Sequence, residues 1–245
     1  FKKVRAGLSR AVRLKACNQF VEKFRQIKDR EEILRIKAAL KINLAMMNYA
    51  GSFLRPGITE QQVLRNLVGF VEKHKVGFAF DSIIASGPHS AFPHARVTDR
   101  RLRRGEPVLI DAGIDMNGYK SDLTRMFFLG KMTTSFQNIY EAVMSAQELA
   151  IQKIRPGIRA AEIDLAARNF LGKKGLARYF SHSLGHGVGL EVHEEPGISA
   201  KSVTVLRPGM IFTVEPGVYL ADKFGVRVED MALVTETGYE VLSKG

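Results

Sequence analysis

The segment EPVLIDAGIDMNGYKSDLTRMFFLG, residues 106–130, contains two extended apolar runs on either side of Asn117-Gly118. An Asn-Gly pair between such runs is a strong signal for a two-residue β-hairpin turn, because both residues tolerate positive φ. In this hairpin the numbers of paired residues sum to 235, so Asp111 lies opposite Thr124. Asp111 and Asp122 then share one face of the hairpin as diagonal neighbours, roughly 7–8 Å apart.

A second pair of carboxylates is predicted in VEPGVYLADKFGVRVED, residues 214–230. Glu215 and Glu229 lie symmetrically about position 222, so a turn centred there places them opposite each other. All four acidic residues have apolar flanks, and buried ionised carboxylates are costly unless positive charge neutralises them. Two divalent cations about 3.5–4 Å apart would supply that charge, so the sequence predicts a metal cluster.

Two histidines that could serve such a cluster lie in GHGVGLEVHEEPG, residues 185–197. His186 is the natural imidazole ligand, because its glycine neighbours allow the backbone to approach the ions closely. The flexible chain between His186 and His193 can place one ring at the metal and the other over a substrate. Oxygen-rich ligation with one histidine suits Mn²⁺, Co²⁺ or Zn²⁺ better than a structural zinc site, which prefers thiolates.

One predicted helical segment of the sequence occurs twice, as an internal repeat. FLRPGITEQQVLRNLVGFVEKHKVGF (53–78) aligns with KIRPGIRAAEIDLAARNFLGKKGLAR (153–178), and Arg-Pro-Gly-Ile occurs in both at matching positions. Each copy is predicted to follow one helix and to begin another. Two such halves predict a pseudo-twofold domain with a site where they meet, and chance recurrence of a helix–turn–helix is the alternative.

The first helix of this arrangement is predicted over residues 30–54, where Arg55-Pro56-Gly57 ends it. Thr59 caps the next helix, with Gln62 in the capping-box position. The apolar residues of that helix are expected to be buried: Val63, Leu64, Leu67, Val68 and Val71. With the two hairpins, this pattern predicts an α+β fold of mostly antiparallel strands, with helices on the outer face.

Composition places the chain among ordinary globular proteins. It has 245 residues, of which 45% are hydrophobic and 25% charged. No uncharged apolar stretch reaches the length of about 18 residues that a membrane span needs, so no membrane partner is expected. The single cysteine, Cys17, cannot form an internal disulfide, and we expect a reducing, cytoplasmic location.

The net charge of +12 is concentrated at the N-terminus. Residues 1–30 hold ten Lys or Arg against two acidic residues, so eight of the twelve net charges lie there. This distribution argues against a nucleic-acid partner for the chain as a whole. The basic segment, residues 1–27, is interpreted as a solvated, partly helical face, with an arm for an acidic partner or a transit peptide as alternatives.

From about residue 28 to the C-terminus the sequence resembles the methionine aminopeptidase, aminopeptidase P and prolidase superfamily, because five ligand motifs occur in order. The resemblance implies the "pita-bread" fold, in which pseudo-twofold α/β halves enclose a curved, mostly antiparallel sheet. It also implies two divalent metal ions, with ligands bridging them or binding one ion each. By resemblance, the bridging ligands are Asp122 and Glu229, one ion is bound by Asp111, and the other by His186 and Glu215.

Four further residues match family positions outside the ligand set. By resemblance, His94 in AFPHARVTDR contacts the substrate near the scissile bond, and His193 hydrogen-bonds the peptide carbonyl and handles protons. His182 in SHSLGH matches a substrate-side histidine of the proline-specific branch. Arg227 lies two residues before Glu229, where it either fixes the carboxylates or binds a substrate carboxylate.

EPGVY, GVRVED and TETGYEVLS resemble the aminopeptidase P and prolidase branch. The implied function is hydrolysis of N-terminal Xaa-Pro bonds, as an aminopeptidase or a dipeptidase. Glu215 would be the proton acceptor, and His193 would stabilise the oxyanion. The alternatives are a catalytically silent peptide-binding protein on the same fold and a specificity like that of methionine aminopeptidases. Since that branch usually carries a separate N-terminal domain, we expect a fragment or a shortened member. For the oligomeric state, a homodimer is one of the alternatives.

Overall fold

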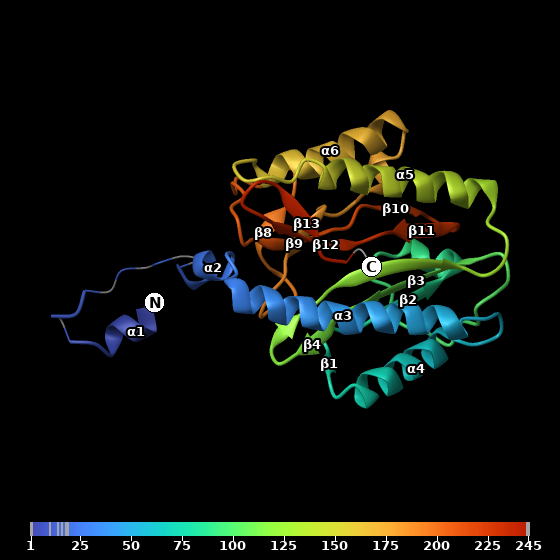
Figure 1. Cartoon of the computed structure of the whole chain (residues 1–245), viewed down its shortest axis with the longest axis horizontal. Coiled ribbons are helices and arrows are strands. Elements are labelled where there is room, and N and C mark those ends of the chain that lie inside the picture. The colour runs from blue at the N-terminus through green and yellow to red at the C-terminus, as the bar shows by residue number, and fades with distance from the viewer. Residues whose placement is uncertain (1, 10, 14, 16, 18–19, 244–245) are drawn as a thin grey trace.

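Two pairs of helices enclose the strands in the computed structural model, which describes residues 2–9, 11–13, 15, 17 and 20–243. The first pair is α3 (Arg30–Phe53) and α4 (Glu60–Lys73), and the second is α5 (Thr134–Ile151) and α6 (Ala160–Lys173). Figure 1 shows the pairs on opposite outer sides, with the strands between them. The α+β architecture with helices outside, and the helix expected over 30–54, are confirmed.

The helices begin at capping residues that the sequence identifies. Thr59 accepts a hydrogen bond from the backbone of Gln62, whose side chain accepts one in return, so the predicted capping box is confirmed. Val63, Leu67 and Val71 are buried in α4. The expectation for Val68 is wrong, since it is 38% exposed, and Leu64 is only partly buried. Both side chains line a cavity, which a periodic apolar pattern does not distinguish from a core.

The strands of the described residues pair in antiparallel fashion and form four sheets. The first half contains β1 (Gly77–Phe78), β2 (Ile83–Ser86), the 3-10 turn η1 (Gly87–Ala91), β3 (Pro107–Ala112), β4 (Ile114–Met116), β5 (Tyr119–Lys120) and β6 (Leu123–Phe128). The second half contains η2 (Ala177–Tyr179), β7 (Gly185–Gly187), β8 (Glu194–Ile198), β9 (Ile211–Val214), β10 (Gly217–Leu220), β11 (Phe224–Arg227), β12 (Asp230–Val234) and β13 (Tyr239–Val241). The sheet orders are β1-β4-β5, β2-β3-β6, β10-β11 and β13-β12-β9-β7-β8.

Both predicted hairpins have the expected register. Asp111 pairs with Thr124 in the β3–β6 ladder, and Asn117 and Gly118 have φ of 54° and 86°, as a type I′ turn requires. In the second hairpin the paired residues sum to 444, in β10–β11 as in β9–β12. Glu215 and Glu229 also sum to 444, and they lie in the gap between those two ladders. Each hairpin is therefore interrupted next to its carboxylates.

The repeated Arg-Pro-Gly-Ile segments make the same contacts in both halves. Gly57 N–H donates to Leu102 O at 2.9 Å, and Gly157 N–H donates to Leu206 O at 2.9 Å. Leu102 and Leu206 in turn donate to Ile58 O and Ile158 O, each at 2.8 Å. A pseudo-twofold relation between the halves, expected from the sequence repeat, is therefore confirmed in the hydrogen bonding.

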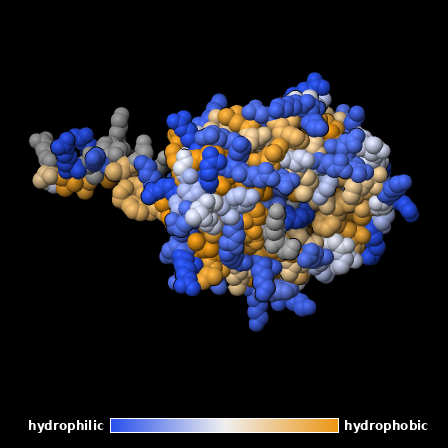
Figure 2. Space-filling model, turned by 45° about the horizontal axis from the view of Figure 1, so that its top comes forward, coloured by the Kyte–Doolittle hydropathy of each residue, from blue (hydrophilic) through white to orange (hydrophobic). Residues whose placement is uncertain are grey.

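Each half has its own hydrophobic core, one built around α3, α4 and the β3–β6 hairpin, the other around α5, α6 and the β9–β12 strands. The basic segment contains α1 (Lys2–Ala6) and α2 (Phe20–Arg25). Figures 1 and 2 show the described residues of this segment at one end of the body, where α1 lies away from the body and α2 lies against it near the start of α3. Among the described residues, no helix combines the length and the apolar content that crossing a membrane requires.

Candidate functional site

A cavity of about 1270 Å³ lies between the two halves. Its walls come from both halves, with α4 and the β1–β2 region on one side and the strands β7, β8 and β11 with adjoining connections on the other. All nine residues predicted for the site line it: Asp111, Asp122, Glu215, Glu229, His94, His182, His186, His193 and Arg227.

Three of the four acidic residues lie where a strand ladder stops. Asp122 directly precedes β6, Glu215 follows β9, and Glu229 lies between β11 and β12. At such breaks the backbone is released from its partner strand, so the side chains can turn toward a common point. The approach is close at Gly113, where an added Cβ would lie 2.3 Å from Ser121 O.

A buried amide satisfies the backbone carbonyls that each break leaves free. In the first half, Asn43 of α3 donates to Ala112 O at 2.8 Å, directly after Asp111. In the second half, Gln147 of α5 donates to Val214 O at 3.0 Å and to Val228 O at 3.2 Å. Those carbonyls directly precede Glu215 and Glu229. The first helix of each half thus holds the break beside its carboxylates.

Three of the acidic residues, Asp122, Glu215 and Glu229, converge on His186. Its Nε2 lies 3.3 Å from Glu215 Oε1 and 3.6 Å from Asp122 Oδ2. One donor atom from each of Asp122, His186 and Glu229 lies within 4.8 Å of the others, an arrangement that could hold a metal ion. His186 Nδ1 lies 3.1 Å from Gly187 O, and a hydrogen bond there leaves Nε2 free to act as a ligand.

Unsatisfied carboxylate oxygens indicate that the site fits cations. Asp111 Oδ1, Asp122 Oδ1 and Glu229 Oε1 are buried without a hydrogen-bond partner among the described residues. Burial raises the pKa of Asp122 and of Glu229 well above the usual range, and neighbouring carboxylates raise it further. Buried polar atoms rarely lack partners, so unpartnered carboxylate oxygens on residues that line one cavity are accounted for by a positive ligand.

Glu215 is the exception among the acidic residues. Burial acts to raise its pKa, but the hydrogen bond and positive charge of His186 outweigh burial and lower it. The same contact raises the pKa of His186 to about 9, although burial opposes this. Thr213 also donates to Glu215 Oε1, at 3.1 Å. Glu215 is therefore the carboxyl that remains ionised most readily.

Arg227 is buried and engages groups of the protein with all three of its nitrogens. It donates to Asp111 Oδ2 at 2.5 Å, to Thr124 Oγ1 at 3.1 Å and to the Tyr219 hydroxyl at 2.7 Å. The Thr124 hydroxyl in turn donates a hydrogen bond to Glu229 Oε2 at 2.8 Å. Of the two roles open for Arg227, this geometry favours fixing the carboxylates over binding a substrate carboxylate.

The other three predicted histidines, His94, His182 and His193, also line the cavity. His182 lies 3.0 Å from the Tyr219 hydroxyl through Nε2 and 2.8 Å from Ser183 O through Nδ1. The His193 ring lies 4.2 Å from the His186 ring, centroid to centroid. Burial lowers the pKa of both His182 and His193, so each favours the neutral form. His94 is exposed at the cavity wall.

Five residues of this arrangement escaped the sequence analysis: Asn43, Thr124, Gln147, Thr213 and Tyr219. Thr124 carried a signal, because the predicted register already placed it opposite Asp111. Tyr219 lies in the quoted stretch EPGVY, but nothing in that stretch indicates that its hydroxyl meets Arg227.

A buried set of carboxylates and an imidazole between two related halves is typical of metal-dependent hydrolases. The chain belongs to metallopeptidase family M24, whose family model matches residues 35–236. The expected relation to the aminopeptidase P and prolidase branch is borne out by the structural neighbours below.

Among solved structures, the chain is similar to the prolidase from Pyrococcus furiosus, with 40% identity and a TM-score of 0.92 over 94% of this chain and 69% of that one. It is also similar to the X-Pro aminopeptidase from Thermotoga maritima MSB8, with 37% identity and a TM-score of 0.91 over 94% and 65% of the two chains.

Among curated proteins, the uncharacterized peptidase YqhT of Bacillus subtilis (strain 168) is 39% identical over 224 residues. The match covers 91% of this chain and 64% of that relative, so the chain spans slightly less than two thirds of the curated relatives it matches.

Proposed function

We propose that this protein is a dinuclear metal-dependent exopeptidase that hydrolyses N-terminal Xaa-Pro bonds. The observation that carries the proposal is the convergence of Asp122, Glu215 and Glu229 on one imidazole, in a cavity that Asp111 also lines and where three buried carboxylate oxygens lack partners. Family membership supports it, as do structural neighbours described as a prolidase and an X-Pro aminopeptidase.

The proposed metal ligands are Asp111, Asp122, His186, Glu215 and Glu229, with Mn²⁺, Co²⁺ or Zn²⁺ as the ions. When bound, the two cations would lower the pKa of water and polarise the scissile carbonyl. The carboxylates offer free oxygens to the cations while Thr124, Arg227 and Thr213 hold their other oxygens. The site is therefore oriented before any ion binds.

The residues around this centre have separate roles in the proposed reaction. Glu215, the most readily ionised carboxyl, accepts the proton of the attacking water. His193, neutral because burial lowers its pKa, donates its ring N–H to the developing oxyanion. His94, from the first half, and His182, from the second half, line the cavity and contact the substrate.

The cavity offers a surface that can recognise a proline ring. An Xaa-Pro bond has no N–H, so the enzyme has no donor to bind there and must recognise the ring by its shape. The first half supplies an apolar wall for this purpose: Leu64, Val68, Phe78, Phe80, Ile83 and Val97. We infer that peptides with varied first residues followed by proline are the substrates.

The test compares kcat/KM for Ala-Pro, Ala-Pro-Ala and Met-Ala-Ser with Mn²⁺ or Co²⁺ supplied. Cleavage of the proline peptides with little cleavage of Met-Ala-Ser supports the proposal. Preference for Ala-Pro identifies a dipeptidase, and cleavage of Ala-Pro-Ala identifies an aminopeptidase. Preference for Met-Ala-Ser contradicts the proline specificity, and no cleavage with both ions bound indicates a binding protein on this fold.

A further inference from the structure

A charged cluster lies directly behind His193, outside the residues assigned so far. Glu194 is the next residue in the chain, and each oxygen of its carboxylate forms an ion pair with a different basic side chain. Lys28 Nζ lies 2.7 Å from Oε1, and Arg25 NH2 lies 2.6 Å from Oε2. The side chains of Lys28 and Glu194 are only 1% and 7% exposed. A buried pair of this kind strongly constrains both partners, because removing one leaves an uncompensated charge.

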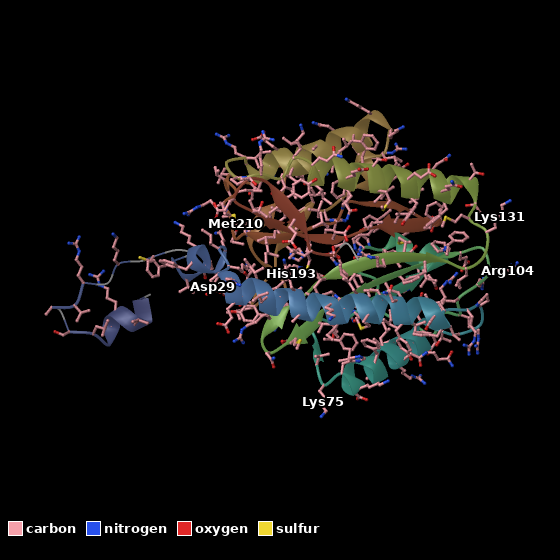
Figure 3. The ribbon with its side chains drawn as sticks, viewed as in Figure 1. Asp29, Lys75, Arg104, Lys131, His193 and Met210 are labelled. Carbon is pink, nitrogen blue, oxygen red and sulfur yellow. The ribbon has the colours of Figure 1, made fainter. Side chains whose placement is uncertain are left out.

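Lys28 is anchored to the second half of the molecule by its backbone. Its N–H donates to Gly209 O at 2.9 Å, and its neighbour Ile27 forms a β-bridge with Met210. The fit is close, because an added Cβ at Gly209 would lie 2.8 Å from Lys28 O. Figure 3 shows His193 on the side of the body where Asp29 and Met210 lie, at the start of α3. Lys28 therefore holds Glu194 from a rigid support.

Glu194 is also confined on its other sides. Its backbone pairs with Gly187, directly after His186, in the β7–β8 ladder. An added Cβ at Gly189 would lie 2.6 Å from Glu194 Oε1, so the carboxylate fills the space beside that glycine. A second cavity of about 430 Å³ borders Arg25, His193 and Glu194, which places the contact of α2 beside the histidine.

The His193 ring has no hydrogen bond of its own within the described part of the chain, unlike His182 and His186. Its position is therefore set by the backbone that carries it. That backbone is held one residue later, at Glu194. The segment between α2 and α3, far away in sequence, is thereby joined to the residue next to His193.

We propose that Lys28 and Arg25 are positioning residues for His193 and act through the Glu194 carboxylate. The proposal rests on the role of His193 in the proposed function. Displacing a reacting group by about 1 Å can cost a factor of about 10² in rate. The effect is expected on kcat rather than on metal binding, because neither cation contacts a proposed ligand.

The test is a double-mutant cycle between Lys28→Met and His193→Ala, measured on Ala-Pro-Ala or Ala-Pro with Mn²⁺. Lys28→Met should lower kcat by about 10- to 100-fold, with KM and bound metal little changed. In the His193→Ala background it should cost almost nothing further, because the residue it positions is gone. Lys28→Arg, which keeps the charge, should recover most of the lost rate.

Lys37→Met is the matched control, since Lys37 makes an ion pair of the same length, 2.7 Å, with Glu240 on the exposed surface. It should leave kcat unchanged. Arg25→Met, which keeps the buried Lys28 pair, serves if Lys28→Met does not fold, and it should show a smaller loss of the same kind. Additive losses in the cycle, loss of metal, or an unchanged kcat in Lys28→Met and Arg25→Met would overturn the proposal.

A readout independent of activity separates this proposal from the proposed function. The ring resonances of His193, assigned by their absence in His193→Ala, should shift or broaden in Lys28→Met and not in Lys37→Met. That result supports positioning even if wild-type protein cleaves none of the peptides, which would count against the proposed function alone. Unchanged His193 resonances in Lys28→Met would overturn the positioning role.

Discussion

The N-terminal half and the C-terminal half of the body share a frame but not a set of side chains. In both, Arg-Pro-Gly-Ile binds the backbone of a leucine, Leu102 or Leu206, at the same distance. In both, a hairpin stops beside its carboxylates, and a buried amide, Asn43 or Gln147, satisfies the carbonyls released there. The common frame thus determines where the acidic residues lie.

The basic side chains that contact those acidic residues, and most of the histidines in the cavity, come from the C-terminal half. Arg227 and His186 contact the carboxylates, and His182 and His193 face the cavity from the same half. The N-terminal half supplies His94 and most of the apolar wall. The repeated frame therefore accounts for where the proposed ligands lie, whereas the basic side chains that contact them come from segments that the halves do not share.

The largest effect is expected from removing, from either half, one of the carboxylates proposed to bridge the ions. Asp122→Ala and Glu229→Ala should both abolish turnover and lower the bound metal, because each removes an unpartnered buried oxygen and one member of the group that could hold a metal ion with His186. Elemental analysis and peptide assays measure this. Asp115→Ala, in the same hairpin but paired with Lys120, is the control and should retain both. Full activity in either carboxylate variant would contradict equal contributions of the halves.

Removing the buried amides should have the next largest effect. Asn43→Leu and Gln147→Leu leave backbone carbonyls unpaired, at a cost of about 1–3 kcal/mol for each group. They should weaken metal binding by about 10- to 100-fold, as loss of groups that orient ligands does. Gln147→Leu should be the more severe, since its amide serves two carbonyls.

Thermal melts and Mn²⁺ titrations measure both properties of the amide variants. Gln137→Leu, at an exposed position of the same helix α5, should change neither. Equal behaviour of Gln137→Leu and Gln147→Leu would show that the amides do not support the ladder breaks.

A smaller effect is expected on the pH dependence of stability in chelator-treated protein. Burial and neighbouring carboxylates raise the pKa of Asp122 and Glu229, and that of His186 is raised to about 9 by Glu215 despite its burial. These groups bind protons more tightly when folded, so their stabilisation is lost as pH rises from the unfolded pKa through the folded pKa.

Tm should therefore fall between about pH 5 and pH 9 when cations are removed. Added Mn²⁺ should raise Tm most at the alkaline end, because metal binding competes with protons. Glu229→Gln cannot ionise and should show a shallower decline. A Tm that rises with pH in chelator-treated wild type would contradict the buried carboxylate cluster.

The smallest effect is expected at the two equivalent turns. Gly57 and Gly157 have φ of 95° and 85°, and an added Cβ would meet no atom within 4 Å at either. Gly57→Ala and Gly157→Ala should each cost about 1 kcal/mol of unfolding free energy through backbone strain alone. Gly69→Ala, inside α4 with equal space, should stabilise by about 1 kcal/mol. Clearly unequal losses at the two turns would weaken the pseudo-twofold relation.

Much of the fold could be predicted from the sequence because its signals are local. The Asn117-Gly118 turn determines the register that places Asp111 opposite Thr124, and Thr59 with Gln62 begins α4. The candidate ligands followed from the same registers and from the resemblance. These features depend on residues a few positions apart, which a single sequence displays.

What could not be predicted depends on contacts between distant segments. Asn43 meets Ala112 across 69 positions, and Lys28 meets Glu194 across 166. An amide or a lysine carries no sign of a partner that far away. The apolar pattern predicted that Val68 is buried. Its side chain instead lines the cavity, which the pattern does not reveal.

The most direct test of the account is the number of cations that bind between the halves. A calorimetric titration of chelator-treated protein with Mn²⁺ should give a binding stoichiometry of two ions per chain. Ala-Pro or Ala-Pro-Ala hydrolysis should appear only as the ions bind. Saturation at one ion per chain, or full peptide hydrolysis with no ion bound, would contradict the claim that the carboxylate pairs of the two halves form one dinuclear site.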